Sequence, residues 1–242
     1  MSLGSLRADL RGSLVDAAAA LALSGAVVGV YAARLHGGVD AAAIEMPDMV
    51  RNGGVWPYSG SQALGWAALL WSWLTIHLGL ALPICRRLRK RRLRARLEAL
   101  HRSMSLTVVG LMLGHALLLL WDRMGDSIVS DFVPWATSYA PGRFPQALGI
   151  FSFYLAVLLG PSFYLRSRLG PVLWRALHQW LVPSVYGLAL WHTLAYGSDI
   201  KHEVVLTAVL WAMQTPLVAL YVVRLWLTRP SSTAVSDSAS AG

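Results

Sequence analysis

Long runs of apolar residues, separated by short polar segments, recur along the whole chain. A helix of about 20 apolar residues is long enough to span the hydrocarbon core of a bilayer. The strands of a membrane barrel would instead alternate apolar and polar residues over about ten positions, and no such alternation occurs. The pattern therefore predicts an all-α protein, a polytopic bundle of six transmembrane helices. The six predicted spans are residues 13–35, 60–85, 99–121, 144–166, 172–197 and 203–227.

The segments between and around these runs are polar. Glycine, proline and acidic residues are frequent in the two longest connections, 36–60 and 122–143, and these residue types are typical of turns and loops. A short segment, 1–12, precedes the six-helix domain of residues 13–228. The small polar residues of the tail, 229–242, predict disorder.

The composition supports a membrane protein. Hydrophobic residues make up 56% of the 242 positions and charged residues only 14%, whereas an average soluble domain is about 25% charged. The single cysteine, Cys85, excludes a disulfide within the chain. The Cys-x-x-Cys-His motif that attaches haem covalently does not occur, so any haem must be held non-covalently.

Basic residues are concentrated in segments that would lie on one side of the membrane. Eight of the eleven residues in 86–96 are Lys or Arg, and further arginines flank the first, fourth and last spans. Acidic residues occupy the connections on the opposite side. Because cytoplasmic loops are enriched in Lys and Arg, we expect both termini to be cytoplasmic, in a multi-pass protein of a bacterial-type inner or plasma membrane. The net charge of +9 then follows from topology and does not indicate nucleic-acid binding.

Two features of this topology stay open. The first apolar run follows a short basic segment, as the apolar run of a signal peptide does, but its length favours a retained span. The basic segment 86–96 is either an anchor to anionic lipid or a docking surface for an acidic electron-donor protein. The anchor is favoured, because the distribution of charge across the membrane requires such residues in any case.

Four histidines lie within two of the predicted spans at equal spacing: His101 and His115 in the third span, His178 and His192 in the fifth. Fourteen residues of helix turn through about 1400°, within about 40° of whole turns, and rise about 21 Å. The two histidines of one helix therefore share a face, one near the inner surface and one toward the outer. Since the two spans run in the same direction, His101 should lie level with His178 and His115 level with His192.

Facing imidazoles of this kind are typical ligands of haem iron, which takes one axial ligand on each side of the porphyrin. The spacing predicts two b-type haems stacked across the membrane, with one haem as the other possibility. Alternatively, each histidine hydrogen-bonds to a neighbouring helix. The ligand role is favoured, because ionisable residues within a membrane are typically functional and four histidines repeat one spacing on two parallel spans.

Other residues of the two histidine spans fit a haem site. Arg102 and Arg175 lie close in sequence to the inner histidines, and we expect them, together with Arg168, to pair with haem propionates. Three glycines would either admit a flat macrocycle close to the backbone or serve close helix packing. They are Gly110, Gly114 and Gly187.

The remaining histidines carry weaker indications. His77, within the second span, lines a third cofactor or quinone site or bonds to a neighbouring helix, and the second role is favoured. His36 and His202 lie at outer span ends and are expected to be solvated. Tyr139 and Arg143 are candidates for shaping an outer acceptor site.

Two stretches, "LHRSMSLTVVGLMLGHALLL" and "WRALHQWLVPSVYGLALWH", resemble the ferric reductase-like transmembrane domain. That superfamily includes ferric reductases, NADPH oxidases, metalloreductases and the haem-binding subunit of a bacterial methionine sulfoxide reductase system. The resemblance covers about residues 60–227 and is carried by the His-Arg start and the two His-x13-His pairs. It implies a six-helix domain that binds b-type haem between the third and fifth spans, with the four histidines in the positions of the axial ligands.

The sequence departs from the larger members of that family. Oxidases and eukaryotic ferric reductases carry a C-terminal flavin and NADPH module, whereas this chain ends about fifteen residues after the last predicted span. No glycine-rich dinucleotide motif follows that span. Electrons are therefore expected to come from a separate donor, a flavoprotein reductase or a quinol.

Together these patterns predict an oxidoreductase component: a dihaem electron-transfer protein that passes electrons from a cytoplasmic donor to an outer acceptor such as ferric iron, oxygen, a quinone or a periplasmic enzyme. One alternative is a haem-binding anchor subunit of a partner oxidoreductase such as a sulfoxide reductase. Another is a quinol-linked b-type cytochrome. A transporter or channel whose histidines relay protons would be colourless, and no interrupted helix pair or inverted repeat supports it.

Overall fold

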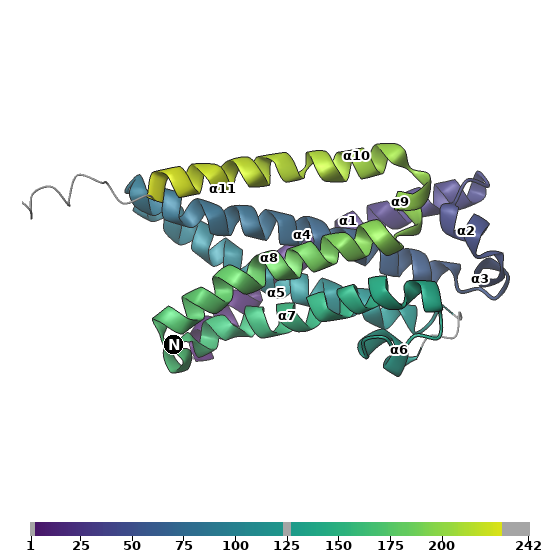
Figure 1. Cartoon of the computed structure of the whole chain (residues 1–242), viewed down its shortest axis with the longest axis horizontal. Helices are drawn as coiled ribbons and strands as arrows, with labels where there is room; N and C mark the ends of the chain where they lie inside the picture. Colours follow the sequence, from purple (N-terminus) through teal and green to yellow (C-terminus); the bar gives the residue numbers. More distant parts are fainter. Residues whose placement is uncertain (1–2, 123–126, 229–242) are drawn as a thin grey trace, which may run out of the picture.

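The computed structural model describes residues 3–122 and 127–228. Every regular element in these two segments is a helix (Figure 1), which confirms the all-α prediction for them. The predicted disordered tail, 229–242, lies outside the described residues. The helices are α1 (Leu3–His36), α2 (Ala41–Glu45), α3 (Pro47–Arg51), α4 (Val55–Arg87), α5 (Arg91–Leu119), α6 (Ile128–Phe132), the 3-10 helix η1 (Ala140–Gly142), α7 (Arg143–Leu169), α8 (Pro171–Tyr196), α9 (Ser198–His202), α10 (Val204–Ala212) and α11 (Gln214–Thr228).

Within the described residues, five helical segments are long and apolar enough to cross a membrane, so the chain has the features of a multi-pass membrane protein. The predicted fifth span corresponds to α8, which is not among them. Its 26 residues are long enough at about 1.5 Å per residue, but Arg175, Gln179 and two histidines dilute its apolar residues. The five segments are Arg7–His36, Val55–Arg87, Arg91–Leu119, Ala140–Gly160 and Val204–Leu227.

The long helices lie side by side along the long axis of the molecule, and the short helices α2, α3, α6 and α9 gather at one end (Figure 1). α4 packs along α5 and α7 along α8, while α1 contacts both α4 and α5, and α11 contacts α4. The start of α1 and the end of α11 both lie at the end opposite the short helices. The chain therefore returns to the side from which it starts.

Two apolar clusters hold the bundle together. In the first, Ala20 of α1 and Ala67 of α4 pack in one buried cluster with Met104 of α5. In the second, Leu69 of α4 packs with Tyr186 of α8 and with residues of α9 and α10. α4 takes part in both clusters and is the central helix of the bundle.

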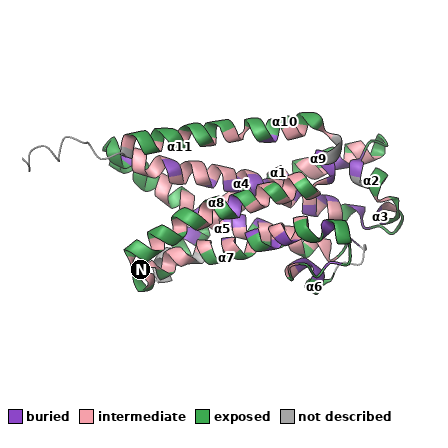
Figure 2. Cartoon of the chain, viewed as in Figure 1, coloured by how far each residue is buried: buried purple, intermediate pink, exposed green. Residues whose placement is uncertain are grey.

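The outer surface of the bundle is strongly apolar. Exposed residues follow the outward sides of α10 and α11 (Figure 2), and they include Val204, 83% exposed, and Trp226, 72% exposed. Extended apolar surface of this kind marks an interaction with a membrane or another protein, and on helices of this length it fits contact with lipid.

The helix boundaries depart from the predicted spans near the basic segment. α5 begins at Arg91, so most of the segment 86–96 is helical and the turn after α4 comprises only Leu88–Lys90. Arg89 has a φ of 56°, the left-handed conformation, which reverses the chain within this short turn. The basic side chains are thus carried on the ends of two helices and not on a loose loop.

The predicted sixth span consists of two helices, α10 and α11, which meet at Met213. Pro216 follows three residues later and has no backbone N–H to donate to the carbonyl of Ala212. The break at Met213 is explained by this missing hydrogen bond.

Candidate functional site

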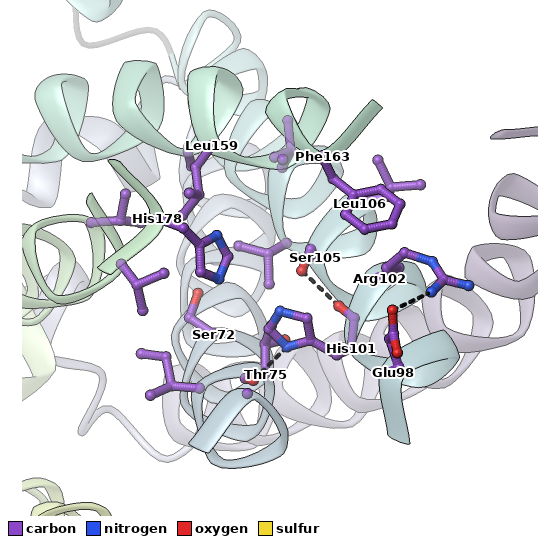
Figure 3. A pocket seen from close by; sticks show the side chains of 18 of the residues that line it. Ser72, Thr75, Glu98, His101, Arg102, Ser105, Leu106, Leu159, Phe163 and His178 are labelled. Carbon is purple, nitrogen blue, oxygen red and sulfur yellow. Dashed lines mark hydrogen bonds and ion pairs between the residues drawn. The ribbon is translucent and has the colours of Figure 1, made fainter. Parts of the chain in front are cut away.

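The four histidines of α5 and α8 face one another in two pairs. The ring centres of His101 and His178 are 6.0 Å apart, and those of His115 and His192 are 6.2 Å apart. We call His101 with His178 the first pair, shown in Figure 3, and His115 with His192 the second pair. Because the lower-numbered histidines of both helices meet and the higher-numbered ones meet, α5 and α8 run in the same direction.

The separation within each pair suits two ligands of one metal ion. An imidazole nitrogen binds a transition-metal ion at about 2 Å and lies about 1 Å from its ring centre, so two rings that clamp one ion have centres about 6 Å apart. The ring planes cross at 69° in the first pair and at 78° in the second. Two ligands on one axis can adopt such angles, since each ring can rotate about that axis.

Three of the four imidazoles are fixed by backbone carbonyls. The Nδ1–H of His101 donates to the carbonyl of Thr75 at 2.9 Å, and the Nδ1–H of His115 donates to that of Ser61 at 2.8 Å. His192 donates in the same way to Pro145 at 2.8 Å. A hydrogen bond at Nδ1 sets the tautomer in which Nε2 carries a lone pair, and this is the arrangement that metal-bound histidines show.

A glycine lies beside each of these three rings, four residues after the carbonyl that accepts the hydrogen bond. A Cβ at Gly65 would lie 3.1 Å from Nδ1 of His115, and one at Gly79 would lie 3.1 Å from Cε1 of His101. At Gly149 it would lie 2.8 Å from Nδ1 of His192. The missing side chain lets each imidazole approach the neighbouring helix closely enough to reach its backbone.

His178 is held differently. Its Nδ1 is buried and has no hydrogen-bond partner among the described residues. The ring instead stacks on Trp174 of the same helix, with ring centres 5.0 Å apart and an angle of 28°. The indole of Trp174 in turn contacts the ring of Phe163 in α7 at 6.1 Å.

A cavity of about 370 Å³ opens around the first pair, within the range of about 300–1,000 Å³ of ligand pockets. His101 and His178 project into it from α5 and α8, as Figure 3 shows. Leu159 and Phe163 of α7 line the same cavity. The arrangement is a largely apolar slot with an imidazole on each side.

Charged groups line part of the cavity, and they differ in part from those predicted. Arg102 lines it, but its guanidinium is paired with Asp9 of α1, with Nε–Oδ2 at 2.9 Å, and approaches Glu98 at 3.6 Å. Arg94 and Arg166 also line the cavity. The two other predicted arginines, Arg168 and Arg175, are exposed and are not among the lining residues.

The glycines predicted on the histidine helices do not contact the rings. A Cβ at Gly110 or Gly187 would meet nothing within 4 Å in the described structure, and one at Gly114 would meet Leu64 at 3.0 Å. Gly110 and Gly187 each follow the first histidine of their helix by nine residues, which is about a half-turn from the histidine face. The glycines that serve the site lie instead on the neighbouring helices, and a repeated spacing of small residues in α4 was their signal in the sequence.

The other predicted residues have different surroundings. His77 donates through Nδ1 to the carbonyl of Trp73 in its own helix at 2.8 Å, not to a neighbouring helix as expected. Its ring lies tilted against that indole, with ring centres 4.0 Å apart and an angle of 48°. His36, at the end of α1, is exposed. Tyr139 is exposed, and Arg143 donates to the carbonyl of Thr137 at 3.0 Å. His202 ends α9.

Among the residues that the structure describes, no group of three or more His, Cys, Asp or Glu side chains is placed to hold a metal ion. The donor set at each level consists of two histidines, which matches the axial demand of haem iron, whose porphyrin supplies the other four ligands. No protein-family model, curated protein or solved structure matches the chain.

Proposed function

We propose that the chain is a b-type dihaem electron-transfer protein of a membrane, built like the ferric reductase-like transmembrane domain. In this proposal α8 is the fifth of six spans and both termini are cytoplasmic. The observation that carries it is the combination of two histidine pairs with ring centres 6.0 and 6.2 Å apart and three Nδ1 atoms bound to backbone carbonyls. Histidines that merely joined helices would have no reason to meet in two pairs at the same separation.

The six-span topology is supported by the return of the chain to its starting side (Figure 1). An even number of crossings follows if α8 crosses with the five more apolar segments. The first pair then lies toward the side of the basic turn between α4 and α5, and this side is cytoplasmic because of its Lys and Arg residues. The second pair lies about 21 Å further along the helices, toward the outer surface.

The histidines would bind iron through Nε2, and the carbonyls of Ser61, Thr75 and Pro145 would keep three rings in orientation. Arg94 and Arg166, which line the cavity, would neutralise propionates, whereas Arg102 is already paired with Asp9. The apolar walls exclude water and so help to set the reduction potential. A haem held at each level supplies a reversible one-electron carrier.

The donor and the acceptor are separate partners in this proposal. The cytoplasmic donor is a flavoprotein reductase or a quinol. It would approach from the side of the basic turn between α4 and α5, next to the first pair, where the same Lys and Arg residues also face anionic lipid. The outer acceptor would approach from the side of the short helices. The bilayer itself is the third partner, through the apolar outer faces of the helices.

The test is a count of haem in the purified full-length chain by the pyridine haemochrome assay. We expect about two b-type haems per chain, as two bis-histidine sites require. His77→Ala is the matched control, since it removes a membrane-embedded histidine whose Nδ1 bonds within α4, and it should keep both haems. A colourless protein would end the proposal, and turnover of the reduced chain with ferric chelates would distinguish a reductase from a subunit that only feeds a partner enzyme.

A further inference from the structure

The carbonyls that accept hydrogen bonds from the histidines are regularly spaced along the neighbouring helix. In two antiparallel helices, moving a given number of residues backward along one reaches the same height as moving that number forward along the other. On α5, the step from His115 back to His101 is matched on α4 by the step from Ser61 forward to Thr75. The two glycines that follow these carbonyls by four residues, Gly65 and Gly79, are also fourteen residues apart.

The same step on α7 leads to a different residue type. His192 of α8 uses the carbonyl of Pro145 and the gap at Gly149. Fourteen residues further along α7, level with His178, stand Leu159 and Phe163. Phe163 thus occupies the position at which the three other histidines find a glycine.

The contacts around His178 agree with the presence of Phe163 where the other histidines have a glycine. Leu159 and Phe163 line the cavity into which His178 projects (Figure 3). The Nδ1 of His178 is buried and finds no acceptor among the described residues. Its ring is steadied by the stack on Trp174, which Phe163 supports from α7.

We propose that Phe163 is a positioning residue that withholds the backbone hydrogen bond from His178 and so raises the reduction potential of the first-pair site. This inference rests on the proposed function, because it concerns iron held between His101 and His178. It makes the two levels unequal: the second pair has two hydrogen-bonded ligands and the first pair only one.

The chemical reason lies in the basicity of the ligand. An imidazole that donates from Nδ1 has a more basic Nε2, and a more basic ligand stabilises ferric iron over ferrous iron. Without that bond His178 is the weaker donor, so the reduced state at the first pair is favoured. The first pair lies nearest the basic turn, where the proposed donor docks, and the site there would accept an electron more readily than one with two bonded ligands.

The experiment is a potentiometric titration of the purified full-length protein, followed by the haem absorption bands and by electron paramagnetic resonance. The component that belongs to the first pair is identified as the one retained in His115→Ala. Phe163→Gly restores the glycine of the other three positions, and it should lower the potential of that component. A tenfold gain in the preference for ferric iron corresponds to a shift of about 59 mV for one electron.

Phe163→Leu is the matched control. It removes the aromatic contacts with Trp174 and with the guanidinium groups of Arg102 and Arg166, but it still places a side chain at the position where the other three histidines have a glycine. We expect the potential in this variant to stay near the wild-type value. An equal shift in both variants, or none in Phe163→Gly, would overturn the inference.

A second variant tests the opposite change, in which a side chain replaces one of the glycines. It does not depend on whether Phe163→Gly folds. Gly149→Ala places a Cβ 2.8 Å from Nδ1 of His192 and should raise the potential of the second-pair component alone. An unchanged second-pair potential would also overturn the inference. These results are separable from the proposed function, since a protein without haem refutes that function, whereas two haems with unshifted potentials refute only the role of Phe163.

Discussion

The glycines beside the histidine rings allow a graded test of the whole site with a single added methyl group. Gly149→Ala brings the new Cβ to 2.8 Å from Nδ1 of His192, and Gly65→Ala brings it to 3.1 Å from Nδ1 of His115. Gly79→Ala brings it to 3.1 Å from Cε1 of His101. A Cβ at Gly110 or Gly187 meets no described atom within 4 Å, so alanine at these two positions supplies matched controls on the ligand helices.

The size of the effect follows from what each methyl displaces. A contact of 2.8 Å is too short to persist, so the ring of His192 must move and lose its bond to Pro145. Losing a second-shell partner of a metal ligand costs about 10–100-fold in affinity, or about 1.4–2.8 kcal/mol at 1.4 kcal/mol per tenfold. At Gly65 and Gly79 a shift of a few tenths of an ångström relieves the contact, so the loss should fall below about tenfold. The exchange itself does not weaken a helix, because alanine has the higher helix propensity.

The assay is a titration of haem into the haem-free full-length protein, with the two sites separated by their absorption bands and the affinity of each fitted. The expected order of loss is Gly149→Ala first, then Gly65→Ala and Gly79→Ala, with the two controls unchanged. Gly79→Ala should weaken the first pair, and the other two should weaken the second. Equal losses in the controls, or a loss at the wrong pair, would refute the geometric argument.

Other changes have equally definite outcomes. His115→Ala should leave one haem per chain by the haemochrome assay, because the first pair, about 21 Å away, keeps both of its ligands; two retained haems would contradict the pairing. Arg102→Ala leaves the buried carboxylate of Asp9 without its bidentate partner, and should lower the free energy of unfolding in detergent by about 3 kcal/mol; an unchanged value would show that this ion pair between α1 and α5 is dispensable. In a variant without its native cysteine, Lys90→Cys should react with an impermeant thiol reagent only from the cytoplasmic side and Asp48→Cys only from the opposite side; labelling from one side for both would refute the six-span topology.

The positions of the long helices could be predicted from the sequence because each depends on local composition. A run of about 20 apolar residues must form a helix in lipid, where every backbone group needs a partner within its own segment. The meeting of His101 with His178 and of His115 with His192 also followed from spacing, since fourteen residues return a helix nearly to the same face. The helix positions needed no knowledge of packing, whereas the pairing also assumed that the third and fifth spans face each other.

The surroundings of the histidines depend on packing and could not be predicted in the same way. Glycines were expected on α5 and α8, the helices that carry the ligands, but Gly110 and Gly187 lie about a half-turn away from the histidine faces. Arg102 lines the cavity as expected of a residue near a propionate, but its pairing with Asp9 of α1 could not be foreseen. Both outcomes are set by a neighbouring helix, whose identity a single-helix pattern does not contain.

The repeated spacing on α4 shows why the sequence nevertheless carried a signal. Two ligands fourteen residues apart on one helix impose the same step on any antiparallel helix that supplies their hydrogen bonds, because both helices rise by the same amount per residue. Ser61 with Gly65 and Thr75 with Gly79 keep that step. On α7 the residue fourteen positions after Gly149 is Phe163, and the histidine at that level, His178, has no acceptor for Nδ1 among the described residues. The missing hydrogen bond of His178 is recognised as an exception because the three other histidines follow the fourteen-residue spacing. The difference between the two pairs therefore becomes visible only once the structure shows which carbonyl each ring reaches.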